Sequence, residues 1–194
     1  MLRSGIACAA SAVRCDDWVS QPFILTAALP PDIQSWSEGL RREHYPPERN
    51  HLHAHVTMFH SFAPSLLAEL RDFLPRVAAE FAPPRAVISG VMDLGTGTAI
   101  ALLSEELLEL RALIAERFHG SLTAQDLHEP RPHITVQNKV TRRQARALQA
   151  TLAAEVELRA GRGRFAFPAL ELHLYQGGPW ERVKRSVFRG QARL

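Results

Sequence analysis

Short apolar or alternating runs along the chain predict β-strands, because strand side chains point alternately to the two faces of a sheet. The first run, PFILTAAL from Pro22 to Leu29, is apolar throughout and ends at two prolines. Later runs indicate a hairpin around Gly95-Thr96-Gly97 and alternating strands near the C-terminus. These further strands are predicted at Arg85 to Leu94, Gly97 to Leu103, Arg164–Phe167, Leu170–Tyr175 and Arg182–Phe188.

Between the strand-like runs, apolar residues recur every three or four positions, which is the period of an amphipathic helix. The first such segment has Ile33, Trp36 and Leu40 on one face, and Asp32 is its predicted N-cap. The second opens at Pro64 in PSLLAELRDFLPRVAAEF. Its internal proline, at position 75, is predicted to kink or break it because proline lacks a backbone N–H.

The second half of the chain repeats this plan. Ser104 caps a helix that ends at Gly120, and a polar loop follows. Thr141 and Gln144 form a capping box at the start of a last long helix. The order helix, short strand, helix and paired strands therefore occurs twice. This repetition predicts two similar α+β lobes that face each other across a groove.

One four-residue pattern, His, aliphatic, Thr, apolar, also occurs twice in strand-like runs. HVTM begins at His55 inside HLHAHVTMFH, and HITV begins at His133 inside RPHITVQNKV. Because residues i and i+2 of a strand share a face, His55 and Thr57 project together. His133 and Thr135 do the same, while the residues between them pack into their own lobe. If both surfaces line one groove, the site holds two imidazoles and two hydroxyls.

That set of groups suits phosphodiester chemistry without a carboxylate or a metal. One neutral imidazole can accept a proton from an attacking water or sugar hydroxyl, and a protonated one can donate to the leaving oxygen. Both roles match the unperturbed imidazole pKa of about 6.5. Threonine hydroxyls can donate hydrogen bonds to the non-bridging phosphate oxygens. The sequence leaves open which histidine is the base.

The paired motifs resemble the signature of the 2H phosphoesterase superfamily, specifically its bacterial 2′-5′ RNA ligase-like branch. The resemblance runs from about Pro22 to the end of the chain and includes FILTAALP, ERNHLHAHVTMFH and LYQGGPWERV. It implies a bilobal α+β fold with pseudo-twofold symmetry, in which antiparallel sheets form a central groove and helices lie outside. It also implies that His55 and His133 are the acid–base pair and that Thr57 and Thr135 bind the phosphate, without metal or cofactor. The implied substrates are RNA ends or nucleotides that carry a 2′,3′-cyclic phosphate or a 2′-5′ linkage.

Four further residues are candidate substrate-binding groups. Gln137 and Lys139 continue the alternation beyond Thr135, and an exposed strand end is the alternative interpretation for them. Tyr175 and Trp180 flank the closing turn, where an aromatic ring can stack on a base. Packing inside the domain is the alternative for this pair.

Composition favours one folded domain. The chain has 194 residues, of which 46% are hydrophobic and 22% charged, with a formal net charge of +3. We expect residues 1–20 to form a flexible N-terminal extension, in preference to a signal peptide, and residues 21–194 to form a single bilobal domain. Cys8 and Cys15 are too few for a disulfide framework, so a reducing, cytoplasmic location is expected. No apolar run is long enough to cross a bilayer, and nothing indicates an obligatory protein partner.

Two other interpretations use the same part of the chain. His51, His53 and His55 form an H-x-H-x-H run, which indicates a zinc-dependent hydrolase if the strand already begins at His51. The mild positive charge indicates a non-catalytic RNA-binding module instead. Its basic rim would come from three arginines for which a solvated helix face is the simpler interpretation: Arg41, Arg42 and Arg49. The two threonines favour catalysis, although the same side chains serve opening and joining of a linkage alike.

Overall fold

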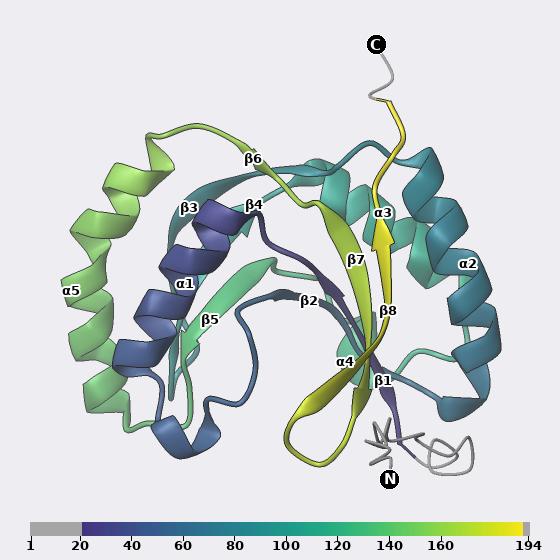
Figure 1. The fold of residues 1–194 in the computed structure, drawn as a ribbon. Helices are drawn as coiled ribbons and strands as arrows, with labels where there is room; N and C mark the ends of the chain where they lie inside the picture. The colour runs from purple at the N-terminus through teal and green to yellow at the C-terminus, as the bar shows by residue number, and fades with distance from the viewer. Residues whose placement is uncertain (1–20, 192–194) are drawn as a thin grey trace, which may run out of the picture.

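The computed structural model describes residues 21–191, whose strands form one curled antiparallel sheet between two pairs of helices (Figure 1). The strand order is β6-β3-β4-β5-β2-β1-β7-β8. The strands are β1 (Phe23–Ala27), β2 (Val56–Phe62), β3 (Arg85–Asp93), β4 (Thr98–Leu103), β5 (His133–Gln137), β6 (Phe165–Ala166), β7 (Ala169–Tyr175) and β8 (Trp180–Val187). The expected α+β class is confirmed, while the two-lobe symmetry stays a prediction. The predicted extension of residues 1–20 lies outside the described residues.

Five α-helices lie within residues 21–191: α1 (Pro31–His44), α2 (Leu67–Glu80), α3 (Glu105–Arg117), α4 (Ala124–Leu127) and α5 (Arg142–Ala160). Short 3₁₀ turns precede β2 at Pro47–Arg49 and α2 at Pro64–Leu66. The predicted Ser104 cap is confirmed, since its Oγ accepts from the Leu107 N–H at 3.1 Å. The capping box is confirmed too, because the backbone N–H of Gln144 donates to Thr141 Oγ1 while the Gln144 side chain accepts from the Thr141 N–H.

Two helix predictions were wrong in detail. The N-cap of α1 is Pro30, not Asp32, because Pro31 has the backbone angle that suits the first helical turn. Asp32 lies inside that first turn, where a carboxylate is favoured by the helix dipole. Helix α2 continues through Pro75, so the predicted break is absent, while a kink at this residue stays a prediction. Its packed apolar face outweighs the lost hydrogen bond, because tertiary packing supplies most helix stability.

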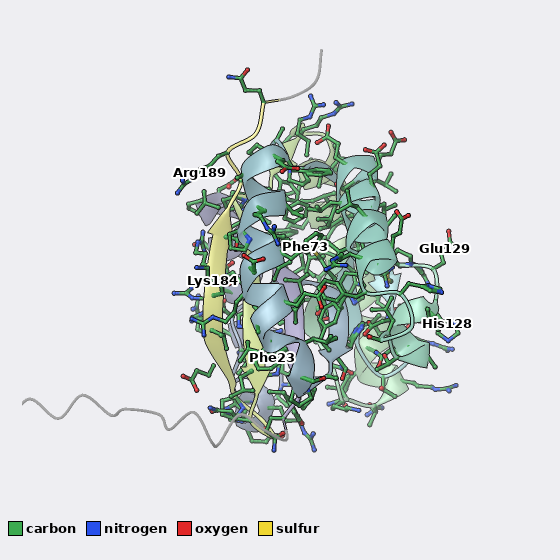
Figure 2. The ribbon with its side chains drawn as sticks, turned by 90° about the vertical axis from the view of Figure 1, so that its right-hand side faces the viewer. Phe23, Phe73, His128, Glu129, Lys184 and Arg189 are labelled. Carbon is green, nitrogen blue, oxygen red and sulfur yellow. The ribbon has the colours of Figure 1, made fainter. Side chains whose placement is uncertain are left out.

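Helices α1 and α5 form one pair and α2 and α3 form another, on opposite flanks of the sheet (Figure 1). On one flank the Trp36 indole of α1 donates to Glu155 of α5 at 2.6 Å, and Arg159 lies over the same indole. On the other flank Phe73 of α2 meets Phe118, just after α3, edge to face at 5.7 Å. Figure 2 shows Phe73 between these helices, with Lys184 at the edge formed by β8. None of the helices within residues 21–191 is long and apolar enough to span a membrane.

The sheet brings the two repeated motifs together at its centre. Strands β2 and β5 are neighbours although 70 residues of chain separate the end of one from the start of the other. They are antiparallel, and their registered pair is Val56 with Ile134. Both of these side chains are buried in the core, at 1% and 0% exposure. The residues on either side of each must therefore point to the opposite face of the sheet.

Candidate active site

The register of β2 and β5 places the two histidine motifs side by side and antiparallel. One step along each strand from the Val56–Ile134 pair sets His55 opposite Thr135 and Thr57 opposite His133. His55 and His133 are then diagonal neighbours on adjacent strands, and the separation typical of the Cα atoms of such a pair is about 7–8 Å. All four side chains are half-buried. They share one face of the sheet, opposite to the face that carries the buried Val56 and Ile134. We call this the motif face.

Each histidine ring is held by a hydrogen bond to the backbone carbonyl two residues before it. The Nδ1 atom of His55 lies 2.6 Å from the carbonyl oxygen of His53, and Nδ1 of His133 lies 2.6 Å from the carbonyl oxygen of Arg131. Because a carbonyl oxygen can only accept, each Nδ1 carries the hydrogen. In the neutral ring Nε2 is then the bare nitrogen, and in the charged ring it is a donor. Each imidazole therefore has one reactive nitrogen that is able to accept or to release a proton.

The surroundings of His55 perturb its pKa strongly. Burial lowers the pKa of His55 to about 4, opposed by its hydrogen bond to the His53 carbonyl. The charges of Arg41, His173 and His133 are smaller causes that act in the same direction as burial and are included in that value. His55 is consequently neutral near pH 7, with Nε2 free to accept a proton.

Trp180 contacts the His55 ring from the start of β8. The two ring centroids are 4.8 Å apart at 45°, and the same indole lies 5.6 Å from the His173 ring on β7. Nε2 of His173 lies 3.0 Å from the hydroxyl of Thr26, which is fully buried on β1. Of the two aromatic candidates, Trp180 thus lies at the motif, whereas Tyr175 sits across the hairpin from it with 37% exposure.

Arg41 links the second motif to the loop that precedes the first motif. Its guanidinium donates to the Thr135 carbonyl at 2.9 Å, to Asn50 Oδ1 at 2.8 Å and to the Leu52 carbonyl at 3.0 Å. The residue is 3% exposed, so the expectation that it lies on a solvated helix face was wrong. The helical turn that carries it faces β5 rather than water. Burial lowers the pKa of Arg41 from its ordinary value, which is far too high for the charge to be lost.

A cavity of about 690 Å³ opens beside His55. Its walls come from the start of α1, the loop before β2 and strands β7 and β8, and they include Trp180, His173 and two arginines. Glu171, Arg182 and Arg185 form a charged group in this wall. The sequence already carried a signal for part of this set, since LELHLY alternates and so places Glu171 and His173 opposite the buried leucines.

Gln137 and Lys139 are not brought to the motif face. A β-bulge shifts the register so that Thr135 pairs with Ala99 but Gln137 pairs with Thr98, which makes Val136 the extra residue. Gln137 is 6% exposed, and its Oε1 accepts from the Thr98 hydroxyl at 3.4 Å. Lys139 follows β5 in a turn with a positive φ of 59° and an exposed side chain.

The run of alternating histidines does not form a strand. Strand β2 begins at Val56, so His51 and His53 precede it in a loop. The His53 side chain is 95% exposed and bonds to Glu38 Oε1 at 3.1 Å. Across residues 21–191 there is no group of three or more His, Cys, Asp or Glu side chains arranged to hold a metal ion. The three histidines therefore do not converge as a ligand set.

The sequence profile of the 2′-5′ RNA ligase superfamily matches residues 29–179, which is most of the chain. The protein belongs to this superfamily, and the resemblance stated from the two motifs is confirmed. No curated protein sequence matches the chain significantly.

Solved structures with the same fold cover nearly the whole domain. The TT0787 protein of Thermus thermophilus has a TM-score of 0.60 and 15% identity, over 88% of this chain and 100% of that one. LigT of E. coli complexed with 3′-AMP has a TM-score of 0.55 and 18% identity, over 87% and 98%. The same protein complexed with ATP has a TM-score of 0.52 and 18% identity, over 89% and 99%. These similarities establish the curled α+β fold.

Proposed function

We propose that this protein is a metal-independent phosphoesterase that opens 2′,3′-cyclic phosphates on nucleotides or RNA ends. The observation that carries the proposal is the pair of imidazoles on adjacent strands, each with Nδ1 bonded to a carbonyl and Nε2 free. A hydroxyl lies opposite each ring, so charge on a phosphate between them can be stabilised. Membership of the 2′-5′ RNA ligase superfamily supports this chemistry.

In the proposed step a water molecule attacks phosphorus while Nε2 of His55 takes one of its protons. The bond from phosphorus to one ribose oxygen breaks, and Nε2 of His133 gives that oxygen its proton. The product is a ribose phosphomonoester with one free hydroxyl. The hydroxyls of Thr57 and Thr135 donate to the two non-bridging oxygens as phosphorus becomes five-coordinate. His55 ends protonated and His133 neutral, so exchange with water restores the starting state.

The assignment of His55 as base rests on its surroundings. The lowered pKa of His55 keeps the ring neutral at pH 7, and the nearby Arg41 cation disfavours a second positive charge there. The other ring then supplies the proton. With the roles exchanged, the same two groups would serve joining of a 2′-5′ linkage, the reverse direction of the chemistry.

The nucleotide class of ligand has independent support. Solved structures of LigT include complexes with 3′-AMP and with ATP, and the present chain shares that fold. The indole of Trp180, in contact with His55, offers a flat surface for a base. We take RNA ends and nucleotides as the substrates to test first.

The test uses His55→Asn and His133→Asn, in which the amide nitrogen can keep the bond made by Nδ1. Each variant is expected to lower kcat for adenosine 2′,3′-cyclic phosphate by about 10²–10⁴-fold, as measured by product chromatography. His128→Asn is the matched control, since His128 lies in an exposed loop at the edge of the molecule away from Lys184 (Figure 2). Full activity in both motif variants would refute the proposal. RNA binding that survives both changes, without turnover of any cyclic phosphate by the wild type, would establish the binding-module alternative.

A further inference from the structure

The cavity beside His55 contains charged side chains that the proposed reaction does not use. Arg182 and Arg185 both lie on β8, and each forms an ion pair with the same oxygen of Glu171 on β7; the Arg182 distance is 3.1 Å. The Glu171 side chain is 14% exposed, whereas the arginine side chains are 57% and 41% exposed. One nearly buried carboxylate thus orients two guanidinium groups that still face the cavity.

The charge balance of this cluster favours an anion. Two guanidinium groups share one carboxylate, so the group carries one net positive charge. A guanidinium has five N–H donors, and Glu171 accepts one from each arginine. The remaining donors lie at the cavity wall, and a guanidinium fork matches the oxygens of a phosphate.

A continuous set of contacts connects this cluster to the reacting imidazole. Trp180 touches the rings of His55 and His173, and His173 is paired across the hairpin with Arg182. The positive charge of Arg182 is one of the causes that lower the pKa of His173, after burial. The cavity between these groups also has apolar walls, formed by Leu29, Pro31, Leu52 and Pro168. A nucleoside therefore has room and apolar contact between the scissile phosphate and the arginines.

We infer that Arg182 and Arg185, oriented by Glu171, bind a second phosphate group of the substrate, on the nucleoside that occupies the cavity beside His55. This inference rests on the proposed function, because it places the scissile phosphate at the two motifs. With the 2′,3′-phosphate held there, the part of a nucleotide that extends away is its 5′ side. The second phosphate is then a terminal 5′-phosphate or the internucleotide phosphate of an RNA end.

The experiment measures binding, so that it does not depend on turnover. Calorimetry compares three ligands: adenosine 3′-monophosphate, adenosine 3′,5′-bisphosphate and the dinucleotide ApA with a 3′-phosphate. At least one of the two ligands with a second phosphate is expected to bind about 10- to 100-fold more tightly than the monophosphate. The terminal phosphate is identified if the bisphosphate shows the gain, and the internucleotide phosphate if the dinucleotide alone shows it. Raising the salt concentration should shrink the ratio.

The double variant Arg182→Gln/Arg185→Gln is expected to bring the affinity ratio close to one. Because that change leaves Glu171 without its arginine partners, the triple variant with Glu171→Gln is measured beside it. Arg76→Gln is the matched control, since Arg76 is an exposed arginine that pairs with Asp72 on α2. It should keep the wild-type ratio.

Equal affinity of the wild type for all three ligands overturns the inference, and so does a preference that survives both variants. Failure of the proposed function is a different result. In that case the cyclic phosphate is not hydrolysed and His55→Asn changes nothing, whatever the affinity ratio.

Discussion

The low pKa of His55 makes the stability of the folded protein depend on pH in a way that one substitution can isolate. In the unfolded chain the imidazole titrates at its ordinary pKa of 6.5, and in the folded protein at about 4. Above pH 6.5 both states are neutral, and the residue adds no pH dependence. As the pH falls from 6.5 towards 4, the unfolded chain takes up the proton and the folded protein does not. Stability is therefore lost over this interval and changes no further below pH 4.

The magnitude follows from the difference between the two pKa values. One pKa unit corresponds to about 1.4 kcal/mol, so the full effect is about 3 kcal/mol. At pH 4.5 about 2.5 kcal/mol of it has been lost. His173 also has a pKa lowered chiefly by burial, so it contributes in the same direction in every variant that retains it. The contribution of His55 is the difference between the wild type and a variant that lacks only this ring.

The assay is urea-induced unfolding at a series of pH values from 7.5 to 4.5, followed by circular dichroism. His55→Asn keeps a donor for the His53 carbonyl but cannot titrate. The free energy of unfolding of the wild type should fall by about 2.5 kcal/mol more than that of the variant between pH 7 and pH 4.5. Parallel curves would refute the reasoning, because they would mean that His55 takes up its proton equally well in the folded protein.

Three other changes test different parts of the site. Replacing Thr57 or Thr135 by Val should lower kcat about 10²-fold, and replacement by Ser should restore most of it, since a hydroxyl stabilises the transition state. Arg41→Met should lower the free energy of unfolding by about 2–4 kcal/mol because buried acceptors lose their donor, while the neighbouring exposed Arg42→Met changes it by less than about 0.5 kcal/mol. Millimolar EDTA should leave turnover of the cyclic phosphate unchanged; activity that EDTA removes and zinc restores would favour the hydrolase based on His51 and its neighbours.

The local part of the fold could be read from the sequence because it depends on neighbouring residues. The strand-like runs, the Ser104 cap and the Thr141–Gln144 capping box are all confirmed. The shared face of His55 and Thr57 follows from strand alternation alone. The duplication of the motif was enough to predict that two histidines act together, and the structure places their strands side by side.

Features that depend on distant pairing could not be read in the same way. The bulge at Val136 is a shift in the pairing of β5 with β4. It turns Gln137 from the motif face into the interior. Arg41 looked like one of several exposed helical arginines until its helix was seen to pack on β5. The pairing of Arg182 with Glu171 on β7 likewise depends on the cross-strand register, which cannot be derived from a single sequence.

The junction of β2 and β5 has a mechanical consequence for the reaction. A single registered pair, Val56 with Ile134, joins them, whereas β7 and β8 are registered along most of their length. Few backbone bonds cross this line, so the apolar side chains that both halves of the sheet share in one core hold β2 and β5 together. The guanidinium of Arg41 bridges the same line through the carbonyls of Leu52 and Thr135, so it adds to this connection. The spacing of the two imidazoles, which must leave room for one phosphate, thus depends on one registered backbone pair, on the shared core and on the hydrogen bonds of Arg41.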